Sequence, residues 1–241
     1  SPSRGLGDVY KRQLDYWFNR SHRRTTPAGE EFEFRYYFCQ REAIETLIYL
    51  KEVRRFNALS QVIAEFGGTT KDIDALGITE DEDLFTRYAF KLATGAGKTK
   101  CMSLAVVWSY FHSLRESDSP FARHFVLIAP NLTVYERLRE DFKPADGRKD
   151  IFDSDPLIPA EWRGDWNLSV VLQDDSSGAA TGGVLYLTNI HRLYNPDNKR
   201  GRKDAETHSW VGPPVSKASA LDTGEILRDR ITKHRRIMVL N

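Results

Sequence analysis

The chain has 241 residues, of which 40% are hydrophobic, 29% charged and 12% aromatic. This composition is typical of a soluble globular protein and excludes a disordered tail, a collagen-like fibre and a disulfide scaffold. Lysine and arginine (35) nearly balance aspartate and glutamate (34), giving a net charge of +1. Any nucleic-acid binding must therefore come from a local patch rather than from an overall field.

Two further features limit the class of protein. No apolar run approaches the roughly 20 residues that a membrane-spanning helix needs. The two cysteines, Cys39 and Cys101, lie far apart and form no CxxC motif. They indicate buried thiols in a reducing, cytoplasmic compartment rather than a zinc site or a redox pair.

Both ends of the chain have unusual sequences. Residues Asp8–Gln13 can be encoded by GAT GTG TAT AAG AGA CAG, which resembles a transposon end used to prepare sequencing libraries. We therefore expect residues 1–13 to be a cloning or sequencing scar, the alternative being a natural flexible N-terminus. At the other end, residues 236–241 look like a buried strand that is cut off before its turn. We expect a reading frame that is truncated at both ends.

The first part of the chain is expected to hold helices behind an aromatic entry segment. Phe32, Phe34 and Tyr36 alternate along the chain, which predicts a short strand. Apolar residues then recur with helical spacing from residue 41 to 66, until Gly67 and Gly68 stop the pattern. Residues 69–83, which end in an acidic run, are expected to form a solvated loop.

From residue 86 onward, strands alternate with helices. Strands are expected over residues 88–93, 124–129, 168–172, 184–187 and 237–241, and helices over 99–114, 133–142 and 225–233. Residues 195–220, which are rich in Pro, Gly and basic residues, are expected to form a long mobile loop. This alternation predicts an α/β fold with a mainly parallel sheet.

The strongest motif is Ala93–Thr99, with the sequence Ala-Thr-Gly-Ala-Gly-Lys-Thr. It lies between an expected strand and an expected helix, which is the context of a phosphate-binding loop (P-loop). Leu92 stands where the full motif has glycine, but Gly-x-Gly-Lys-[Ser/Thr] arises by chance in only about one chain per hundred. We expect Lys98 to reach the β- and γ-phosphates and Thr99 to hold Mg²⁺. The predicted nucleotide-binding residues of the loop are Thr94, Gly95, Ala96, Gly97, Lys98 and Thr99, of which Lys98 and Thr99 are the predicted catalytic residues.

With this loop, the chain resembles the superfamily-two helicases and translocases. Residues Tyr37–Ile44 are similar to the glutamine motif that precedes the P-loop in that family. More narrowly, residues 34–241 resemble the DEAD/DEAH-box motor subunit of type III restriction enzymes. The resemblance implies a RecA-like P-loop NTPase fold, ATP and Mg²⁺ as cofactors, DNA as a partner, and a modification subunit as a possible second partner.

The resemblance also assigns a role to Gln40. Its amide offers both a donor and an acceptor, as recognition of the adenine edge requires. Tyr37 or Phe38 could stack on the base. The alternative is that Gln40 is an ordinary surface residue at the start of a helix.

Two strand ends are the candidate contacts with the nucleic-acid backbone. Pro130, Asn131 and Thr133 open a helix whose free N–H groups suit a phosphate. Thr188 and Asn189 follow another strand and resemble a Thr-Asn pair of the family. The alternative for both segments is an ordinary turn. The basic run Lys199–Lys203 is either a solvated linker or a sequence-independent contact with DNA.

In the family, the last strand runs directly into Asp-Glu-Ala-His, whose acidic groups hold Mg²⁺ and position the attacking water. Neither this motif nor a second RecA-like lobe is present in the 241 residues. The whole protein is therefore expected to be a DNA-dependent ATPase, while this chain binds nucleotide without efficient hydrolysis. The expected divisions are 1–13 as the scar, 14–85 as the segment with the glutamine motif, and 86–241 as the first, incomplete lobe. A P-loop phosphotransferase and a binding module without catalysis remain alternatives.

Overall fold

The computed structural model describes residues 8–26, 28–67, 77–79, 83, 87–145, 147–175, 182–193 and 227–241. The chain divides into two compact units, Ser1–Leu104 and Ala105–Asn241. In the described residues, no helix is long and apolar enough to cross a membrane. The expected loop over residues 195–220, the basic run at 199–203 and most of the loop at 69–83 lie outside the described residues.

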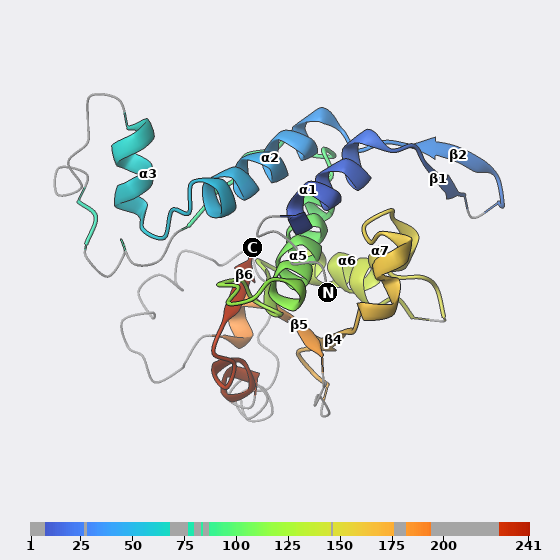
Figure 1. The fold of residues 1–241 in the computed structure, drawn as a ribbon. Coiled ribbons are helices and arrows are strands. Elements are labelled where there is room, and N and C mark those ends of the chain that lie inside the picture. Colours follow the sequence, from blue (N-terminus) through green and yellow to red (C-terminus); the bar gives the residue numbers. More distant parts are fainter. Residues whose placement is uncertain are drawn as a thin grey trace. The chain divides into compact units, whose positions relative to one another are not determined.

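The first unit consists of helices and a small hairpin (Figure 1). Its hairpin strands are antiparallel, with His22 opposite Phe34. The helical stretch expected over residues 41–66 is present, but it is interrupted after Val53, and the second helix ends at Gly67 as predicted. The elements are α1 (Asp8–Leu14), a π-helical turn (Asp15–Asn19), β1 (His22–Thr25), β2 (Glu31–Phe34), α2 (Phe38–Ile48), a second π-helical turn (Tyr49–Val53) and α3 (Leu59–Phe66).

Residues 8–14 form helix α1, in which Val9 and Gln13 are buried. The scar interpretation, and the functional boundaries expected at residues 13 and 85, stay predictions.

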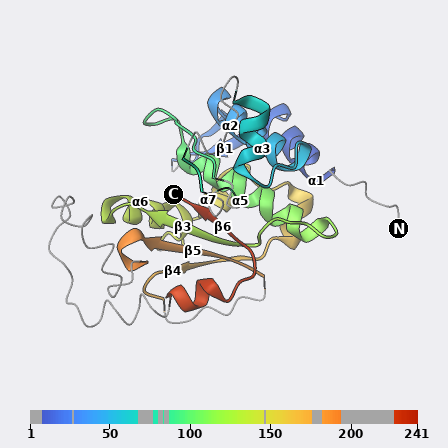
Figure 2. The same ribbon diagram turned by 90° about the vertical axis from the view of Figure 1, so that its left-hand side faces the viewer.

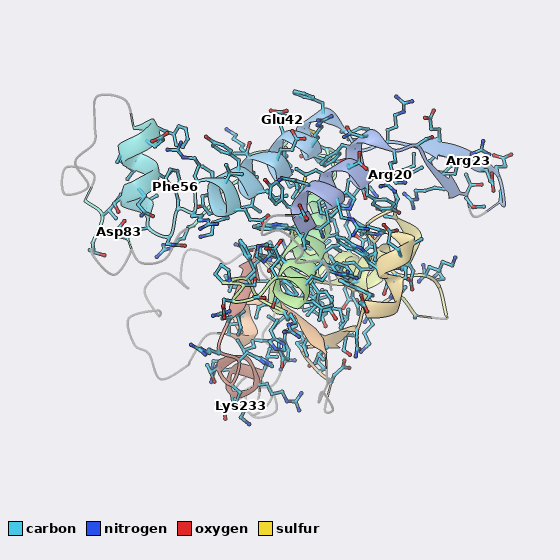
Figure 3. All side chains as sticks on the ribbon, in the orientation of Figure 1. Arg20, Arg23, Glu42, Phe56, Asp83 and Lys233 are labelled. Atoms are coloured by element: carbon cyan, nitrogen blue, oxygen red, sulfur yellow. The ribbon has the colours of Figure 1, made fainter. Side chains whose placement is uncertain are left out.

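The β1–β2 hairpin has an exposed surface on which opposite charges are paired. Arg23, which Figure 3 labels on β1, forms an ion pair with Glu31 on β2 at 3.0 Å, and both side chains are largely exposed. Arg35 pairs with Glu33 in the same way, at 2.8 Å. Each of these two arginines therefore has an acidic neighbour on β2.

One expected strand is missing. Residues 87–93 carry no regular secondary structure, and Phe90 is 41% exposed. The prediction of a strand over 88–93 is therefore wrong for this structure. A strand exists only through ladder hydrogen bonds to a neighbour, and residues 87–93 pair with no strand in the described part of the chain.

The second unit is built on a four-stranded sheet with the order β4-β5-β3-β6 (Figure 2). All three strand pairs are parallel, which confirms the predicted α/β class. β3 and β4 have exactly the predicted bounds. The elements are α5 from residue 105 onward (the whole helix being Lys98–Arg115), β3 (His124–Ala129), α6 (Leu132–Phe142), α7 (Ile151–Ser154), a 3-10 helix (Ala160–Asp165), β4 (Leu168–Leu172), β5 (Gly183–Asn189), a 3-10 turn (Ile190–Arg192), a helical segment over residues 227–232, and β6 (Ile237–Leu240).

Burial in the sheet follows strand position. Every residue of the central strand β5 is buried, as expected for a strand of a parallel sheet that is covered on both faces. On one face, Val126, Val184 and Tyr186 pack with Leu227 of the 227–232 helix. The outer strand β6 is more open, and Val239 is 60% exposed.

An aromatic cluster helps to hold the helices of this unit together. The ring of Phe111 on α5 lies 4.9 Å from that of Trp162, and Tyr110 lies 4.7 Å from Trp166. The Tyr110 hydroxyl donates to the Asp165 carbonyl and accepts from the Asn167 amide, at 3.2 and 3.0 Å. The Tyr110–Trp166 contact is edge-to-face and the Phe111–Trp162 contact is tilted. Such aromatic contacts with a satisfied hydroxyl stabilise a core, so these tryptophans are packing residues.

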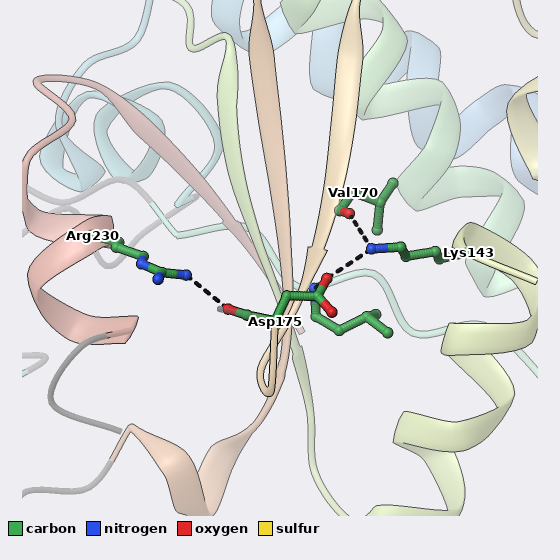
Figure 4. A network of polar contacts seen from close by, with 5 residues as sticks. Lys143, Val170, Asp175 and Arg230 are labelled. Atoms are coloured by element: carbon green, nitrogen blue, oxygen red, sulfur yellow. Dashed lines mark hydrogen bonds and ion pairs between the residues drawn. The ribbon is translucent and has the colours of Figure 1, made fainter. Parts of the chain in front are cut away.

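A polar network fixes the turn that follows β4 (Figure 4). Lys143, at the end of α6, donates to the carbonyl of Val170 at 3.1 Å and to the Asp175 carboxylate at 2.7 Å. The same carboxylate accepts from the amide of Leu172 at 2.9 Å. Arg230 donates to the Asp175 carbonyl at 2.9 Å. One aspartate thereby ties β4 to α6 and to the 227–232 helix.

We expect Asp175→Asn to lower the free energy of unfolding by about 1 kcal/mol at pH 7, because it removes a partly exposed ion pair. Burial raises the pKa of Asp175, but the Lys143 ammonium, the Leu172 amide and the charge of Arg230 outweigh it and hold the pKa below its usual value. The carboxylate therefore stabilises the fold above the unfolded-state pKa of about 3.9, and this contribution is lost as pH falls through the folded-state pKa.

Urea unfolding of the wild type and of Asp175→Asn between pH 7 and pH 2.5 measures this effect. The difference between the two proteins should shrink below about pH 4. Glu42→Gln, which alters an exposed carboxylate on α2, serves as the control. A difference that stays constant to pH 2.5 would show that the Asp175 charge does not stabilise the turn.

Candidate functional site

The P-loop of the first unit is a tight turn that two glycines make possible. The amide of Ala96 donates to the Ala93 carbonyl at 3.2 Å. Gly95 and Gly97 have φ angles of +82° and +78°. These values lie in the left-handed region, which residues with a Cβ rarely adopt. The alternation of glycines in the sequence thus corresponds to the alternation of backbone conformation in the loop.

Helix α5 begins directly after this turn, as predicted. The amides of Lys100 and Cys101 donate to the Gly97 carbonyl at 2.9 and 3.3 Å. The amides of Lys98 and Thr99 precede these bonds, in the part of a helix whose N–H groups have no partner within the helix. Together with the helix dipole, they form the kind of N-terminus that binds phosphate.

The side chain of Lys98 is folded back over the loop. Its ammonium donates to the Ala93 carbonyl at 3.0 Å, and the residue is exposed. A phosphate oxygen is a stronger acceptor for an ammonium than a neutral carbonyl. The lysine is therefore able to exchange this internal bond for a contact with an anion at the loop.

Thr99 is half-buried in the first turn of α5, where its carbonyl accepts from the Ser103 hydroxyl at 2.9 Å. This bond fixes the backbone of the turn. The Thr99 side chain ends in a hydroxyl oxygen, the type of ligand that hard divalent cations prefer.

Gln40 is joined to the P-loop although the two are 56 positions apart. Its Nε2 donates to the Ala96 carbonyl at 2.8 Å, and its Oε1 accepts from the Tyr37 amide at 2.9 Å. A Cβ built on Gly97 would lie 2.2 Å from this Nε2. Spacing along the chain did not predict this contact, because it depends on how α2 folds against the loop.

Gln40 is far less exposed than the two aromatic residues that precede it in the glutamine motif. The glutamine itself is 1% exposed, while Tyr37 is 61% and Phe38 76% exposed. The side-chain amide of Gln40 has a second donor hydrogen on its nitrogen and a second lone pair on its oxygen. A base could reach these groups only if neighbouring atoms moved, whereas the two aromatic rings are accessible as they stand.

In the second unit, the carboxyl ends of β3 and β5 lie side by side, with Ala129 opposite Asn189. Pro130, Asn131 and Thr133 are exposed at the start of α6. The side chain of Asn131 caps this helix by accepting from the Val134 amide at 2.9 Å. The turn therefore has a structural role, and it also presents a capped helix N-terminus at the edge of the sheet.

Thr188 and Asn189 are placed differently from Asn131, with exposures of 0% and 2%. The amide of Asn189 donates to the Gln173 side chain at 3.0 Å, and its Oδ1 accepts from the His191 amide at 2.9 Å. Its Nδ2 is buried without a hydrogen-bond partner among the described residues. These two residues shape the turn after β5 from within rather than presenting a surface.

Charge near this edge is partly neutralised. Arg139 on α6 pairs with Glu136 at 3.1 Å and lies 3.9 Å from Glu140. Arg137 is exposed on the same helix. Any attraction of an anion to this edge thus comes mainly from the N-terminus of α6 and from Arg137.

The comparisons with known proteins agree with this arrangement. The family described as type III restriction enzyme, res subunit, matches residues 31–211, about three quarters of the chain. Searches of the curated proteins and of the solved structures returned no match. The matched family has a P-loop helicase fold, and the matched range includes the glutamine motif, the P-loop and the strands β3, β4 and β5. The chain belongs to the family of type III restriction enzyme res subunits.

Proposed function

We propose that this chain is the ATP-binding part of a DNA-dependent ATPase, a helicase or translocase of a restriction-type system. The observation that carries the proposal is the hydrogen bond from Gln40 to the carbonyl of Ala96. It joins a base-recognition candidate to a phosphate-binding candidate in one place. A nucleotide has these two ends, so a site that binds both of them favours ATP over a simple anion.

In this proposal, the loop residues bind the phosphates and the loop amides orient them. Lys98 exchanges the Ala93 carbonyl for the β- and γ-phosphates, and the Thr99 hydroxyl holds Mg²⁺. The metal ion, when bound, neutralises charge that develops on the phosphates. Gln40 recognises the adenine edge after local movement, and Tyr37 or Phe38 stacks on the base.

We further propose that the carboxyl edge of the second unit contacts the DNA backbone. Pro130, Asn131 and Thr133 provide a helix N-terminus without sequence preference. Thr188 and Asn189 position the neighbouring turn, and the Nδ2 of Asn189 has no hydrogen-bond partner in the part of the chain that the structure describes. A modification subunit is a proposed partner. The free cysteines are consistent with a cytoplasmic protein.

Residues 86–241 are proposed as the first RecA-like lobe. The 241 residues contain no Asp-Glu-x-His motif, so we expect them to bind Mg-ATP without efficient hydrolysis. Phosphoryl transfer depends on positioned acidic groups and on arginine fingers, each of which can account for several orders of magnitude in rate.

We expect Lys98→Ala to weaken Mg-ATP binding at least tenfold, because it removes a charge-assisted contact worth about 1.5–3 kcal/mol. Isothermal titration with ATP and with a non-hydrolysable analogue measures the change. Lys91→Ala, which removes an exposed lysine upstream of the loop, is the matched control. Equal affinities in the two variants would contradict the assignment of Lys98.

Gln40→Ala tests base recognition separately from phosphate binding. We expect the preference for ATP over GTP to fall toward unity, because the amide that distinguishes the bases is lost. Binding of inorganic tripolyphosphate should change much less, because it has no base. A parallel loss for ATP and tripolyphosphate would instead show that Gln40 only supports the P-loop.

Thr133→Glu tests the proposed DNA contact without loss of the helix. A carboxylate in the first turn is favourable for α6 but repels a phosphate, so we expect at least fivefold weaker binding of labelled single-stranded DNA. Wild-type affinity should also fall as salt rises from 50 to 200 mM.

Fluorescence anisotropy measures the binding, and the control is Thr232→Glu at the end of the 227–232 helix, which precedes β6. The same affinity for both glutamate variants would rule out the α6 N-terminus as the contact.

A further inference from the structure

Two histidines of the second unit stack on each other at the amino ends of β3 and β6. His124 is the first residue of β3 and stands opposite Ile237, the first residue of β6. His234 lies in the turn between the 227–232 helix and β6, where its amide donates to the Ile231 carbonyl at 3.2 Å. The ring centroids of the two histidines are 3.8 Å apart, and the rings are inclined by 22°. The proposed function uses neither side chain.

The hydrogen bonds of this pair suit two neutral rings. The Nδ1 of His124 is buried and has no hydrogen-bond partner among the described residues. In a neutral imidazole this nitrogen can be the one without a proton, whereas protonation would leave an N–H group there without an acceptor. The Nε2 of His234 lies 2.9 Å from the hydroxyl of Tyr186, which is buried. An unprotonated Nε2 accepts the phenolic proton, and a protonated one cannot.

The ionisable groups around this pair are a phenol and several arginines. Tyr186 faces it from β5, and Arg123 immediately precedes β3. Arg230 of the helix before β6 acts electrostatically on the Tyr186 hydroxyl, and Arg235 and Arg236 are exposed in the approach to β6. In the part of the chain that the structure describes, no carboxylate pairs with either imidazole. A proton added to the stack would therefore meet positive neighbours.

These surroundings favour the neutral form of both histidines. Burial lowers the pKa of His124, and the neighbouring His234 and Arg123 lower it further. Burial also lowers the pKa of His234. Two imidazolium rings at this separation would repel each other, so the stack is stable only while the rings do not both carry a proton.

We propose that the stack of His124 on His234 is a pH-sensitive latch, which holds the start of β6 on the sheet while both rings are neutral and releases it on protonation. β6 is the outer strand of the described sheet, bonded there to β3, and Val239 is 60% exposed. Such a strand can open without the rest of the sheet. The latch concerns the fold of the second unit and does not rest on the function proposed above.

The direction of the pH effect follows from the lowered pKa values. When β6 is released, both histidines titrate near the ordinary value of about 6.5. The released form binds more protons than the latched form once pH falls through this value, so the latch is strongest above about pH 7.5 and weakens below about pH 6.5. Each histidine that stays neutral in the latched form raises the opening equilibrium constant by up to about tenfold for each pH unit below about 6.5.

Hydrogen exchange of the 241-residue chain at pH 7.5, 6.5 and 5.5, corrected for the intrinsic exchange rates, tests the latch. We expect the β6 amides to lose protection by at least about threefold between pH 7.5 and 5.5, and the amides of the central strand β5 to change less. NMR titration of the ring protons should place both histidines below about pH 6.5 in the folded chain. His191→Gln, which alters an exposed histidine, is the matched control and should leave the exchange of β6 unchanged.

Two substitutions separate the charge from the packing. His124→Phe keeps an aromatic ring against His234 but cannot gain a proton. His234→Gln keeps an amide that can accept from the Tyr186 hydroxyl. Each substitution should reduce the pH dependence of β6 exchange, and the double variant should abolish it.

Unchanged protection of β6 between pH 7.5 and 5.5, or an equal loss in β5 and β6, would overturn the proposal. So would a pH dependence that persists in the double variant. The ring titration of the wild type needs no variant, so it decides the matter even where a substitution prevents folding. Titration of either His124 or His234 at or above about pH 6.5 in the folded chain would show that the stack does not favour neutral rings.

Discussion

The arrangement of the first unit depends on one hydrogen bond, from Gln40 Nε2 to the carbonyl of Ala96. Its donor is almost fully buried, where a lost partner costs more than at the surface. The same side chain accepts from the Tyr37 amide and so also fixes the first turn of α2. One amide thus sets the position of a helix start, of the P-loop and of the aromatic residues that precede it.

The second unit depends on a different constraint, the parallel direction of its strands. Because β3, β5 and β6 point the same way, the segments that follow them emerge at one edge of the sheet. Ligands of such sheets bind outside the carboxyl ends of the strands. This explains why the capped turn at Asn131 and the buried turn at Asn189 are neighbours, although one is exposed and the other is not.

Sequence patterns predicted those parts of the structure that depend on local spacing. The buried run His124–Ala129 and the run Leu168–Leu172 are strands with exactly the predicted bounds, because a continuous apolar run suits a covered parallel sheet. The prediction of a strand over residues 88–93 was wrong, because a strand needs a partner strand elsewhere in the chain to pair with. Two other features also depend on residues that are distant in the sequence. They are the burial of Thr188 and Asn189 and the contact of Gln40 with the loop. Residue type indicated their chemistry but not their exposure.

The two loop glycines show how one motif can hold two different constraints. At Gly95, only the positive φ excludes other residues, because no atom of the described residues lies within 4 Å of the place that a Cβ would take. At Gly97, the positive φ is joined by the Gln40 nitrogen, 2.2 Å from that place. A side chain at Gly97 would therefore strain the backbone and also displace the glutamine that connects α2 to the loop. Gly97 is therefore needed both for the turn of the loop and for the contact with Gln40. The glutamine motif and the P-loop thus depend on each other structurally.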